Sequence, residues 1–351
     1  MQHSSPLSRL LRRRVDPVLE AVMRSVSRRD VRGPLRTWLA PHRSEAMRRA
    51  LDVYAPRLAP LAGAVQQREP EAIARYDALV GEALDSMRKS RPGEREDGGQ
   101  RAARDVVLGA IDERLYRDRP ELMDDPSFPE DERIESLDLL DRFNRCTGIY
   151  ETVRESIEPL VAIAERAGRR PVRVHDVASG HGGLALYLAE TMGDRVAIEA
   201  SDIRSEYLDL GRAQAAERGL RVDFSVEDAL ALDGLARRGV DVITCTQALH
   251  HFPPGMIARM MGEAARAAKV GACFVDGERS WLSYGLLALT GVLYGRSYTF
   301  LHDATVSIRR MFYEEELALL AALAPAMPEG ARIETGIAPP SHVFVRIEGR
   351  A

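Results

Sequence analysis

Hydrophobic and polar residues follow two different periods along this chain, and the period changes near residue 171. Over residues 5–90, apolar residues recur at helical spacing with arginines on the opposite face, and prolines interrupt the pattern. Further helices are predicted at 101–116 and, as one long helix, at 134–167. The residues between them, 91–100 and 117–133, have the composition of loops. The first part of the chain is therefore predicted to be helical.

From Pro171 onward, short apolar runs alternate with helical segments. The runs are separated by roughly one helix each, and they read PVRVHDVA, RVAIEASD, LRVDFSVED, VDVITCT and GACFVDG. This alternation favours right-handed β-α-β units and a parallel sheet. After a predicted helix at 313–324, the runs ARIETGI and SHVFVRIEG are joined by APPS alone, so they are predicted to pair as antiparallel neighbours. The expected fold is a doubly wound α/β sheet with a terminal antiparallel hairpin, preceded by an all-helical domain.

Two domains are expected from the change of pattern: a helical N-terminal domain at 1–133, which covers the site or forms a dimer, and an α/β domain at 134–351. An insertion at about 279–312 separates the fifth strand from the last helix and is expected to form a lid. Its apolar segment is predicted either to pack as a core helix against the N-terminal helices or to line a pocket for an aromatic or lipid-like ligand.

Charge and composition restrict the partners. The net charge is −4, while residues 1–91 contain 18 Lys and Arg against 10 Asp and Glu; the rest of the chain is therefore acidic, and no nucleic-acid partner is expected. Three cysteines without metal-like spacing suit a reducing compartment, and no metal site is expected. No segment is apolar and long enough for a signal peptide or a membrane span, so we expect a cytoplasmic protein, with a homodimer through the N-terminal helices as one option.

A glycine-bearing turn follows the first predicted strand, in the stretch RVHDVASGHGGLALYLAE. Gly180 and Gly182 let the backbone approach a ligand closely, and the N–H groups of the following helix favour an anion. The pattern GHGGLA, with Asp202 twenty residues beyond Gly182, matches a dinucleotide-binding fingerprint. Asp176 opposes that interpretation, because a carboxylate would repel a pyrophosphate. A ligand that carries both an ammonium and a carboxylate suits the turn better.

At this point the chain resembles the class I methyltransferases that use S-adenosylmethionine (SAM), a family with a Rossmann-like fold. DVASGHGG matches the first motif of that family, with Ala178 where a glycine is frequent, and DVITCTQALHHF resembles its fourth-strand motif. The resemblance is clear over 171–277 and weaker to residue 347. Within the family, LHHF and DRFNRCTGIYETV resemble the quinone-biosynthesis and natural-product branch.

The resemblance implies a set of cofactor-binding residues. Asp202 corresponds to the acid on the ribose hydroxyls, and Asp228 corresponds to an acid near the adenine; each could instead cap a following helix. The helix before the first strand is expected to close over SAM, although its Phe143 and Tyr150, seven residues apart on one face, could equally be ordinary packing residues. The full set is Asp176, Ala178, Ser179, Gly180, Gly182, Asp202, Ile203, Asp228, Ala229, Gln247, Tyr150 and Arg145.

Histidines are the candidates for deprotonating a methyl acceptor. His250 and His251 follow the fourth strand, and since adjacent residues are not expected to point at one ligand, His251 is preferred. His302 lies in the insertion and could also be a surface residue. The predicted function is methyl transfer from SAM to O, N or C of a small, aromatic or apolar acceptor. The alternatives are an RNA or protein methyltransferase, a SAM-binding subunit without catalysis, and an NAD(P)-dependent oxidoreductase.

Overall fold

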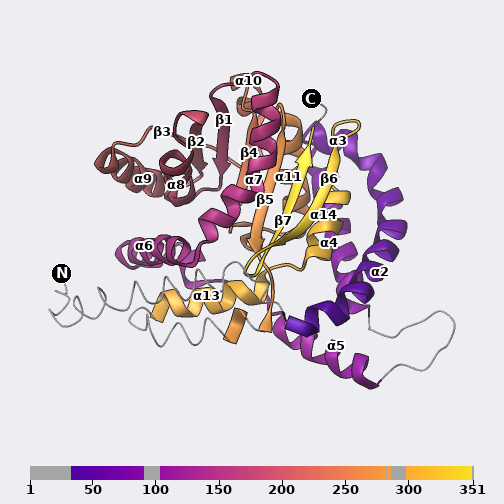
Figure 1. Ribbon diagram of the computed structural model, residues 1–351. Coiled ribbons are helices and arrows are strands. Elements are labelled where there is room, and N and C mark those ends of the chain that lie inside the picture. The colour runs from indigo at the N-terminus through magenta and orange to yellow at the C-terminus, as the bar shows by residue number, and fades with distance from the viewer. Residues whose placement is uncertain (1–32, 91–102, 282, 286–297, 350–351) are drawn as a thin grey trace.

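The computed structural model describes residues 33–90, 103–281, 283–285 and 298–349. Residues 5–32 of the helical pattern expected over 5–90, residues 286–297 of the insertion and the whole 91–100 loop lie outside these residues. Within the described part, seven strands form one sheet in the order β3-β2-β1-β4-β5-β7-β6 (Figure 1). The parallel strands are β1 (Val172–Val177), β2 (Val196–Asp202), β3 (Val222–Val226), β4 (Val242–Thr246) and β5 (Gly271–Gly277).

The end of the sheet is antiparallel, as the short APPS connection predicts. Strand β7 (His342–Glu348) lies between β5 and β6 (Arg332–Ala338) and runs antiparallel to both. Val345 of β7 pairs with Phe274 of β5 and with Thr335 of β6. The expected fold class, a doubly wound sheet with a terminal antiparallel hairpin, is confirmed.

Helices cover both faces of the sheet. One face carries α7 (Ile149–Arg166), α8 (Gly183–Met192) and α9 (Ser205–Arg218), and the other carries α10 (Asp233–Arg238), α11 (Pro254–Ala267) and α14 (Glu314–Ala322). The central strands are buried on both faces, and all seven residues of β5 are buried. This burial explains why these strands read as continuous apolar runs rather than as alternating ones.

Helices from the first part of the chain form an outer layer on α11 and α14. They are α2 (Gly33–Leu58) and α4 (Pro70–Lys89), joined by η1 (Ala59–Leu61) and α3 (Ala62–Gln66). Their apolar side chains belong to the same buried cluster as α11 and α14, and the hydroxyl of Tyr76 donates to the Leu323 carbonyl at 2.6 Å. The boundary at 133/134 and a dimer through these helices remain predictions.

The helix expected at 134–167 is two helices, which corrects that prediction. The first, α6 (Glu130–Thr147), ends at Gly148, whose φ of 76° is left-handed, and α7 begins at the next residue. A glycine in this conformation terminates helices because it has no Cβ to clash. Phe143 and Tyr150 therefore do not share a face: Phe143 packs against Phe300, and Tyr150 packs against Tyr187.

The carboxyl ends of the parallel strands face α6 and α13 (Tyr298–Arg310), which lie together beneath the sheet in Figure 1. Two 3₁₀ turns, η2 (Leu122–Asp124) and η4 (Leu249–His251), contact α13 there, and the helix predicted at 101–116 is α5 (Ala103–Leu115). A further 3₁₀ turn, η3 (Gly193–Arg195), precedes β2. None of the described helices combines the length and apolar character that crossing a membrane requires.

Candidate functional site

The turn after β1 has the backbone of a ligand-binding loop. Three of its residues have positive φ: Ala178 at 51°, Gly180 at 56° and Gly182 at 78°. A Cβ on Gly182 would lie 2.5 Å from the Phe224 ring, and one on Gly183 would lie 2.3 Å from the Tyr150 hydroxyl oxygen. Glycine is thus required at positions 182 and 183. Ala178 holds a backbone conformation that costs a non-glycine residue about 1 kcal/mol or more.

Two carboxylates lie beside this turn. Asp176 is 2% exposed, and its Oδ1 has no hydrogen-bond partner among the described residues. Burial, with a smaller contribution from the charge of Asp202, raises the pKa of Asp176 well above its ordinary value. A buried acceptor without a partner is costly, and at the end of a central strand it marks a position that suits a cationic ligand group.

Asp202 connects the first turn to the second. Its Oδ2 accepts a hydrogen bond from the Gly180 N–H at 2.8 Å, and its Oδ1 accepts one from the Arg204 N–H at 3.0 Å, directly before α9. Burial raises the pKa of Asp202, although these backbone donors oppose the shift. The carboxylate therefore holds the glycine turn and the residue before α9. Because the N-cap residue of α9 is Arg204 and makes no side-chain capping bond, Asp202 does not cap that helix.

A third carboxylate, Asp141 of α6, was not predicted from the sequence. Its Oδ2 accepts a hydrogen bond from Arg145 Nε at 3.0 Å, its Oδ1 accepts one from the Tyr150 hydroxyl at 2.9 Å, and His181 Nε2 lies 3.9 Å away. Burial opposes ionisation, but His181, Arg145 and Tyr150 together lower the pKa of Asp141 to about 2. Tyr150 and Arg145 thus both bind Asp141 beside the glycine turn. The spacing of four residues between Asp141 and Arg145, which places them on one face of a helix, was the sequence feature that could have revealed Asp141.

The turn after β4 repeats these features next to the first one. Gln247 has a φ of 53°, and its Oε1 accepts a hydrogen bond from Asn144 Nδ2 of α6 at 2.7 Å. Three further buried polar atoms at these turns lack partners among the described residues: Asn144 Oδ1, Thr246 Oγ1 and Ser179 Oγ. Strained backbone and unpaired polar atoms therefore gather where β1 and β4 lie side by side.

The residues expected near an adenine lie at the ends of β2 and β3, on the same edge of the sheet. Ile203 is 71% exposed, Ala229 is partly buried, and Asp228 is exposed. Asp228 Oδ1 accepts a hydrogen bond from the Leu230 N–H at 2.9 Å, within a turn. Because α10 begins only at Asp233, Asp228 does not cap that helix.

His250 and His251 both place Nε2 near the Glu121 carboxylate, at 3.7 Å and 3.9 Å; the preference for His251 at the acceptor stays a prediction. The 3₁₀ turn η4 brings their ring centroids to 4.4 Å. His250 Nδ1 contacts Asp276 at 2.9 Å, and His251 Nδ1 contacts Asp124 at 3.2 Å. Burial opposes protonation of His251, but Asp124 and Glu121 outweigh it and raise its pKa; burial likewise opposes ionisation of Asp276, yet His250 lowers its pKa.

His302 is separate from that pair. Its Nδ1 contacts Asp303 Oδ1 at 2.9 Å, its ring faces Tyr298 at 5.7 Å, and it lines a cavity of about 280 Å³ together with Arg117 and Arg309. The structure thus brings His250 and His251 together with Glu121, a residue that the sequence did not single out, and leaves His302 beside basic residues.

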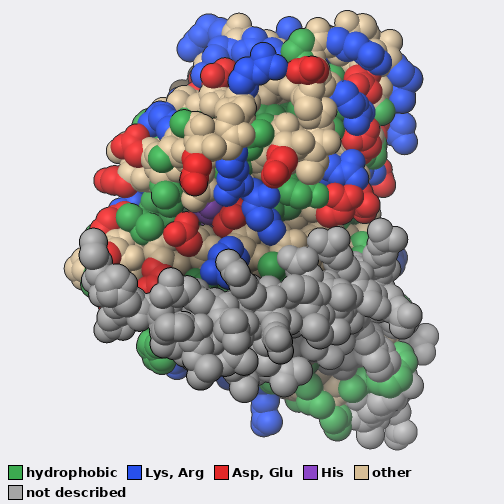
Figure 2. Space-filling model, turned by 60° about the vertical axis from the view of Figure 1, so that its left-hand side comes forward, with side chains coloured by type: hydrophobic (Ala, Val, Ile, Leu, Met, Phe, Trp, Pro, Cys, Tyr) green, Lys and Arg blue, Asp and Glu red, His purple; other side chains and the backbone are tan. Residues whose placement is uncertain are grey.

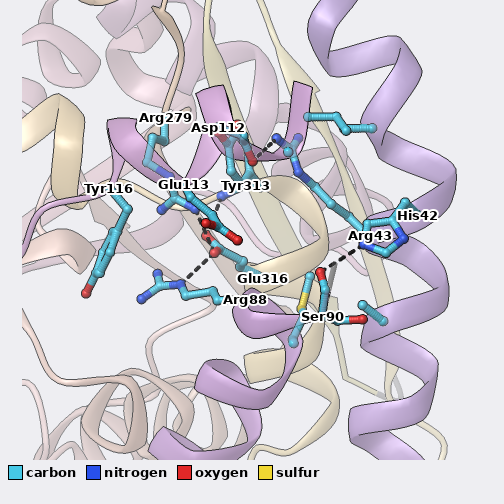
Figure 3. A pocket seen from close by; sticks show the side chains of 14 residues that line it. His42, Arg43, Arg88, Ser90, Asp112, Glu113, Tyr116, Arg279, Tyr313 and Glu316 are labelled. Carbon is cyan, nitrogen blue, oxygen red and sulfur yellow. Dashed lines mark hydrogen bonds and ion pairs between the residues drawn. The ribbon is translucent and has the colours of Figure 1, made fainter. Parts of the chain in front are cut away.

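A further cavity, of about 130 Å³, lies between α2, α5 and α14 (Figure 3). Glu316 accepts hydrogen bonds from Arg88 Nε at 2.7 Å and Arg279 Nη2 at 2.8 Å, and Arg43 Nη2 donates to Asp112 at 2.8 Å. Basic and acidic side chains alternate around this cavity, and none of them borders the glycine turn. Its ion pairs connect the N-terminal helices to α14.

Comparison with known proteins assigns a class to the central region. Residues 174–271, which run from β1 to the start of β5, match the family model of a methyltransferase domain. Together with the strand order and the glycine turn, this match confirms the expected resemblance: the region is a domain of the class I SAM-dependent methyltransferase type. The same finding disfavours the dinucleotide interpretation of GHGGLA.

Two curated relatives and one solved structure are similar to this chain. A demethylmenaquinone methyltransferase of Deinococcus radiodurans is 36% identical over 91 residues, 26% of this chain and 37% of that protein. A ubiquinone/menaquinone biosynthesis C-methyltransferase of Bradyrhizobium diazoefficiens is 34% identical over 110 residues, 31% of this chain and 42% of that protein. A plantazolicin methyltransferase crystallised with SAH gives a TM-score of 0.48 at 14% identity, covering 64% of this chain and 92% of that chain. The chain spans less than half the length of either curated relative.

Proposed function

We propose that this protein transfers a methyl group from SAM to O, N or C of a small apolar or aromatic acceptor. The observation that carries the proposal is the buried Oδ1 of Asp176, which has no partner among the described residues. It lies at the end of β1, next to the first turn of α8, whose N–H groups have no partners within the helix. A carboxylate and free N–H groups side by side match the ammonium and the carboxylate of a methionine moiety.

Other residues around the turns are assigned to the rest of the cofactor. Asp202 is assigned to the ribose hydroxyls, and Ile203, Asp228 and Ala229 are assigned to the adenine. Ala178, Ser179, Gly180 and Gly182 form the backbone cradle, while Tyr150 and Arg145 act through Asp141. Gln247 is held by Asn144 and would face the methyl group. SAM, when bound, supplies a methyl group already activated on a sulfonium, so this chain has mainly to orient the acceptor and exclude water.

The acceptor is assigned to the region where α13 contacts both η4 and α6. His250 and His251 are the polar groups there, and Phe143 and Phe300 form an apolar pair with ring centroids 6.1 Å apart. The two curated relatives are named for quinone biosynthesis, which supports a small aromatic acceptor.

Surface charge favours a small acceptor over RNA. On the face shown in Figure 2, Lys and Arg side chains are interspersed with Asp and Glu, and the visible described residues form no continuous basic surface. A polyanion would need a basic trough that leads into the site.

A thermal-shift panel with SAM, SAH, NAD and NADP tests the proposal. At a hundredfold excess over Kd, a bound ligand adds about 2.7 kcal/mol to the free energy of unfolding. We expect SAM and SAH to raise the melting temperature, NAD and NADP to leave it unchanged, and Asp202→Ala to remove most of the SAM shift. Stabilisation by a dinucleotide, or none by SAM and SAH, would refute the cofactor assignment.

A further inference from the structure

Three side chains from two distant parts of the chain converge beneath the carboxyl ends of β4 and β5. They are Glu121, at the start of η2, and His250 and His251 of η4; one potential metal-ligand atom from each lies within 4.8 Å of the others. Glu121 and His250 are buried, while the side chain of His251 is 34% exposed. Two imidazoles and one carboxylate form a common ligand set for divalent transition metals.

The orientation of both imidazoles matches that of metal ligands. Each Nδ1 contacts a carboxylate: His250 that of Asp276 at 2.9 Å, and His251 that of Asp124 at 3.2 Å. A carboxylate on Nδ1 fixes the tautomer in which Nε2 has a free lone pair, which is the usual arrangement behind a ligating histidine. Both Nε2 atoms then face Glu121, at 3.7 Å from Oε1 for His250 and 3.9 Å from Oε2 for His251.

These separations suit one ion after a small adjustment. Ligands at about 2.1 Å from a tetrahedral ion stand about 3.4 Å from each other. The two distances from Nε2 to Glu121, 3.7 Å and 3.9 Å, exceed that value by a few tenths of an ångström, and one ligand atom from each of the three residues lies within 4.8 Å of the others. Three protein ligands leave one coordination position of a tetrahedral ion open, and the His251 side chain is 34% exposed.

The loop that carries Glu121 is fixed before any ion binds. Asp303 of α13 accepts hydrogen bonds from the N–H groups of Leu122 at 2.8 Å and Met123 at 3.0 Å. The hydroxyl of Ser307, one helical turn later, donates to Glu121 Oε1. The carboxylate is therefore held in place by α13 rather than by the histidines alone.

Local charge also favours a cation. Three carboxylates contact the two rings, those of Glu121, Asp124 and Asp276, and Arg310 Nη1 lies 3.2 Å from Asp124. With neutral imidazoles, the cluster has a clear excess of negative charge, which a divalent ion would compensate.

We propose that Glu121, His250 and His251 bind a divalent first-row transition ion, with Zn²⁺ as the probe of choice. Its open position would bind and polarise an oxygen of the methyl acceptor as a Lewis acid. This last role depends on the proposed methyl transfer, whereas ion binding itself does not.

Ion binding is tested on the full chain after treatment with a chelator. Titration calorimetry with Zn²⁺ and visible absorption with Co²⁺ are expected to show one site. Glu121→Gln, which retains a hydrogen-bond acceptor for Ser307, and His251→Ala should each weaken the affinity at least a hundredfold. Asp124→Asn, behind His251, should weaken it about 10- to 100-fold. His42→Ala, which removes a partly buried histidine of α2 whose ring contacts the Ser90 carbonyl at 3.0 Å, is the control and should bind as the unaltered protein does.

The outcomes separate this proposal from its competitors. The proposal is overturned if neither Zn²⁺ nor Co²⁺ binds. It is also overturned if Glu121→Gln and His251→Ala bind the ion as tightly as the unaltered protein does. Either result would leave a metal-free hydrogen-bonded cluster. Circular dichroism verifies that each variant is folded. Without metal, SAM should still raise the melting temperature of Glu121→Gln. If SAM raises the melting temperature of neither the unaltered protein nor any variant, the cofactor assignment is refuted and the metal result is unaffected.

Discussion

Replacing Asp176 by asparagine is predicted to stabilise the ligand-free protein while weakening its affinity for SAM. The carboxylate is 2% exposed, and its Oδ1 has no partner among the described residues. Burying an unpaired polar group costs about 1–3 kcal/mol, and an amide at the same place avoids the charge but still leaves polar atoms unpaired. We therefore expect the free energy of unfolding to rise by about 1 kcal/mol at neutral pH.

The affinity should change in the opposite direction. A hydrogen bond to a charged group contributes about 1.5–3 kcal/mol, which corresponds to about 10- to 150-fold in Kd. The amide of Asp176→Asn retains an oxygen that can accept a hydrogen bond but loses the charge that attracts an ammonium. The expected increase in the Kd of SAM therefore lies near the lower end of that range.

The pH dependence of unfolding gives an independent check. Burial raises the pKa of Asp176 in the folded state, so above the ordinary pKa near 3.8 the folded state retains a proton that the unfolded state has lost. This residue therefore makes the ligand-free protein less stable as the pH rises from about 4 toward the folded-state pKa. Asp176→Asn should remove that decline.

Urea unfolding at several pH values and SAM titration calorimetry measure these effects. The matched control is Asp241→Asn at the opposite edge of the sheet, where the carboxylate accepts a hydrogen bond from the Arg173 N–H at 3.0 Å and pairs with Arg169. This control should lose stability and leave the SAM affinity unchanged. If Asp176→Asn binds SAM as tightly as the unaltered protein, the role given to Asp176 is wrong.

Three further changes probe other parts of the chain. Asp202→Asn should weaken SAM about 10-fold or more by calorimetry, because it removes a charged acceptor for the ribose, and an unchanged Kd would contradict that role. Ala178→Gly should raise the free energy of unfolding by about 0.5–1 kcal/mol in urea, since φ is 51° there; a loss of stability would refute the inferred strain. Burial opposes ionisation of Glu316, but Arg279 and Arg88 lower its pKa from 4.5 to about 2. Its ionisation therefore contributes about 3 kcal/mol to the free energy of unfolding at neutral pH, and this contribution is lost as the pH falls from 4.5 to 2. In Glu316→Gln, the free energy of unfolding measured in urea should depend less on pH over that interval.

Much of the fold could be predicted because its signals are local. Each parallel strand is a short apolar run buried on both faces, and the APPS connection is too short for anything but an antiparallel return. The prediction of one long helix was wrong because the helix is interrupted at Gly148, and the apolar pattern continues on both sides of that residue. Periodicity does not reveal such a break, because a single glycine is tolerated within many helices.

The site could be predicted in part, and its missing residues share a physical reason. Asp176, Asp202 and the glycines follow strands directly, so topology alone places them at one edge of the sheet. Asp141 and Glu121 come from α6 and from the loop after α5, and their positions depend on how helices pack over that edge. Contacts between elements distant in sequence leave no periodic signal in a single chain.

The position of Glu121 gives the first part of the chain a role beyond covering the sheet. Asp112 of α5 binds Arg43 of α2 and accepts a hydrogen bond from the Tyr313 hydroxyl, as Figure 3 shows. The carbonyl of Leu115, at the end of α5, accepts a hydrogen bond from Arg309 Nε of α13 at 3.0 Å. Six residues later the chain reaches Glu121. Helix α5 is thus fixed to α2, α13 and the residue before α14, and it delivers a buried carboxylate to the two histidines. If the first part of the chain only covered the sheet, its removal would leave every residue of the Glu121–His250–His251 cluster in place. Removal of the segment from α5 to Glu121 would instead take away one of the three side chains of that cluster.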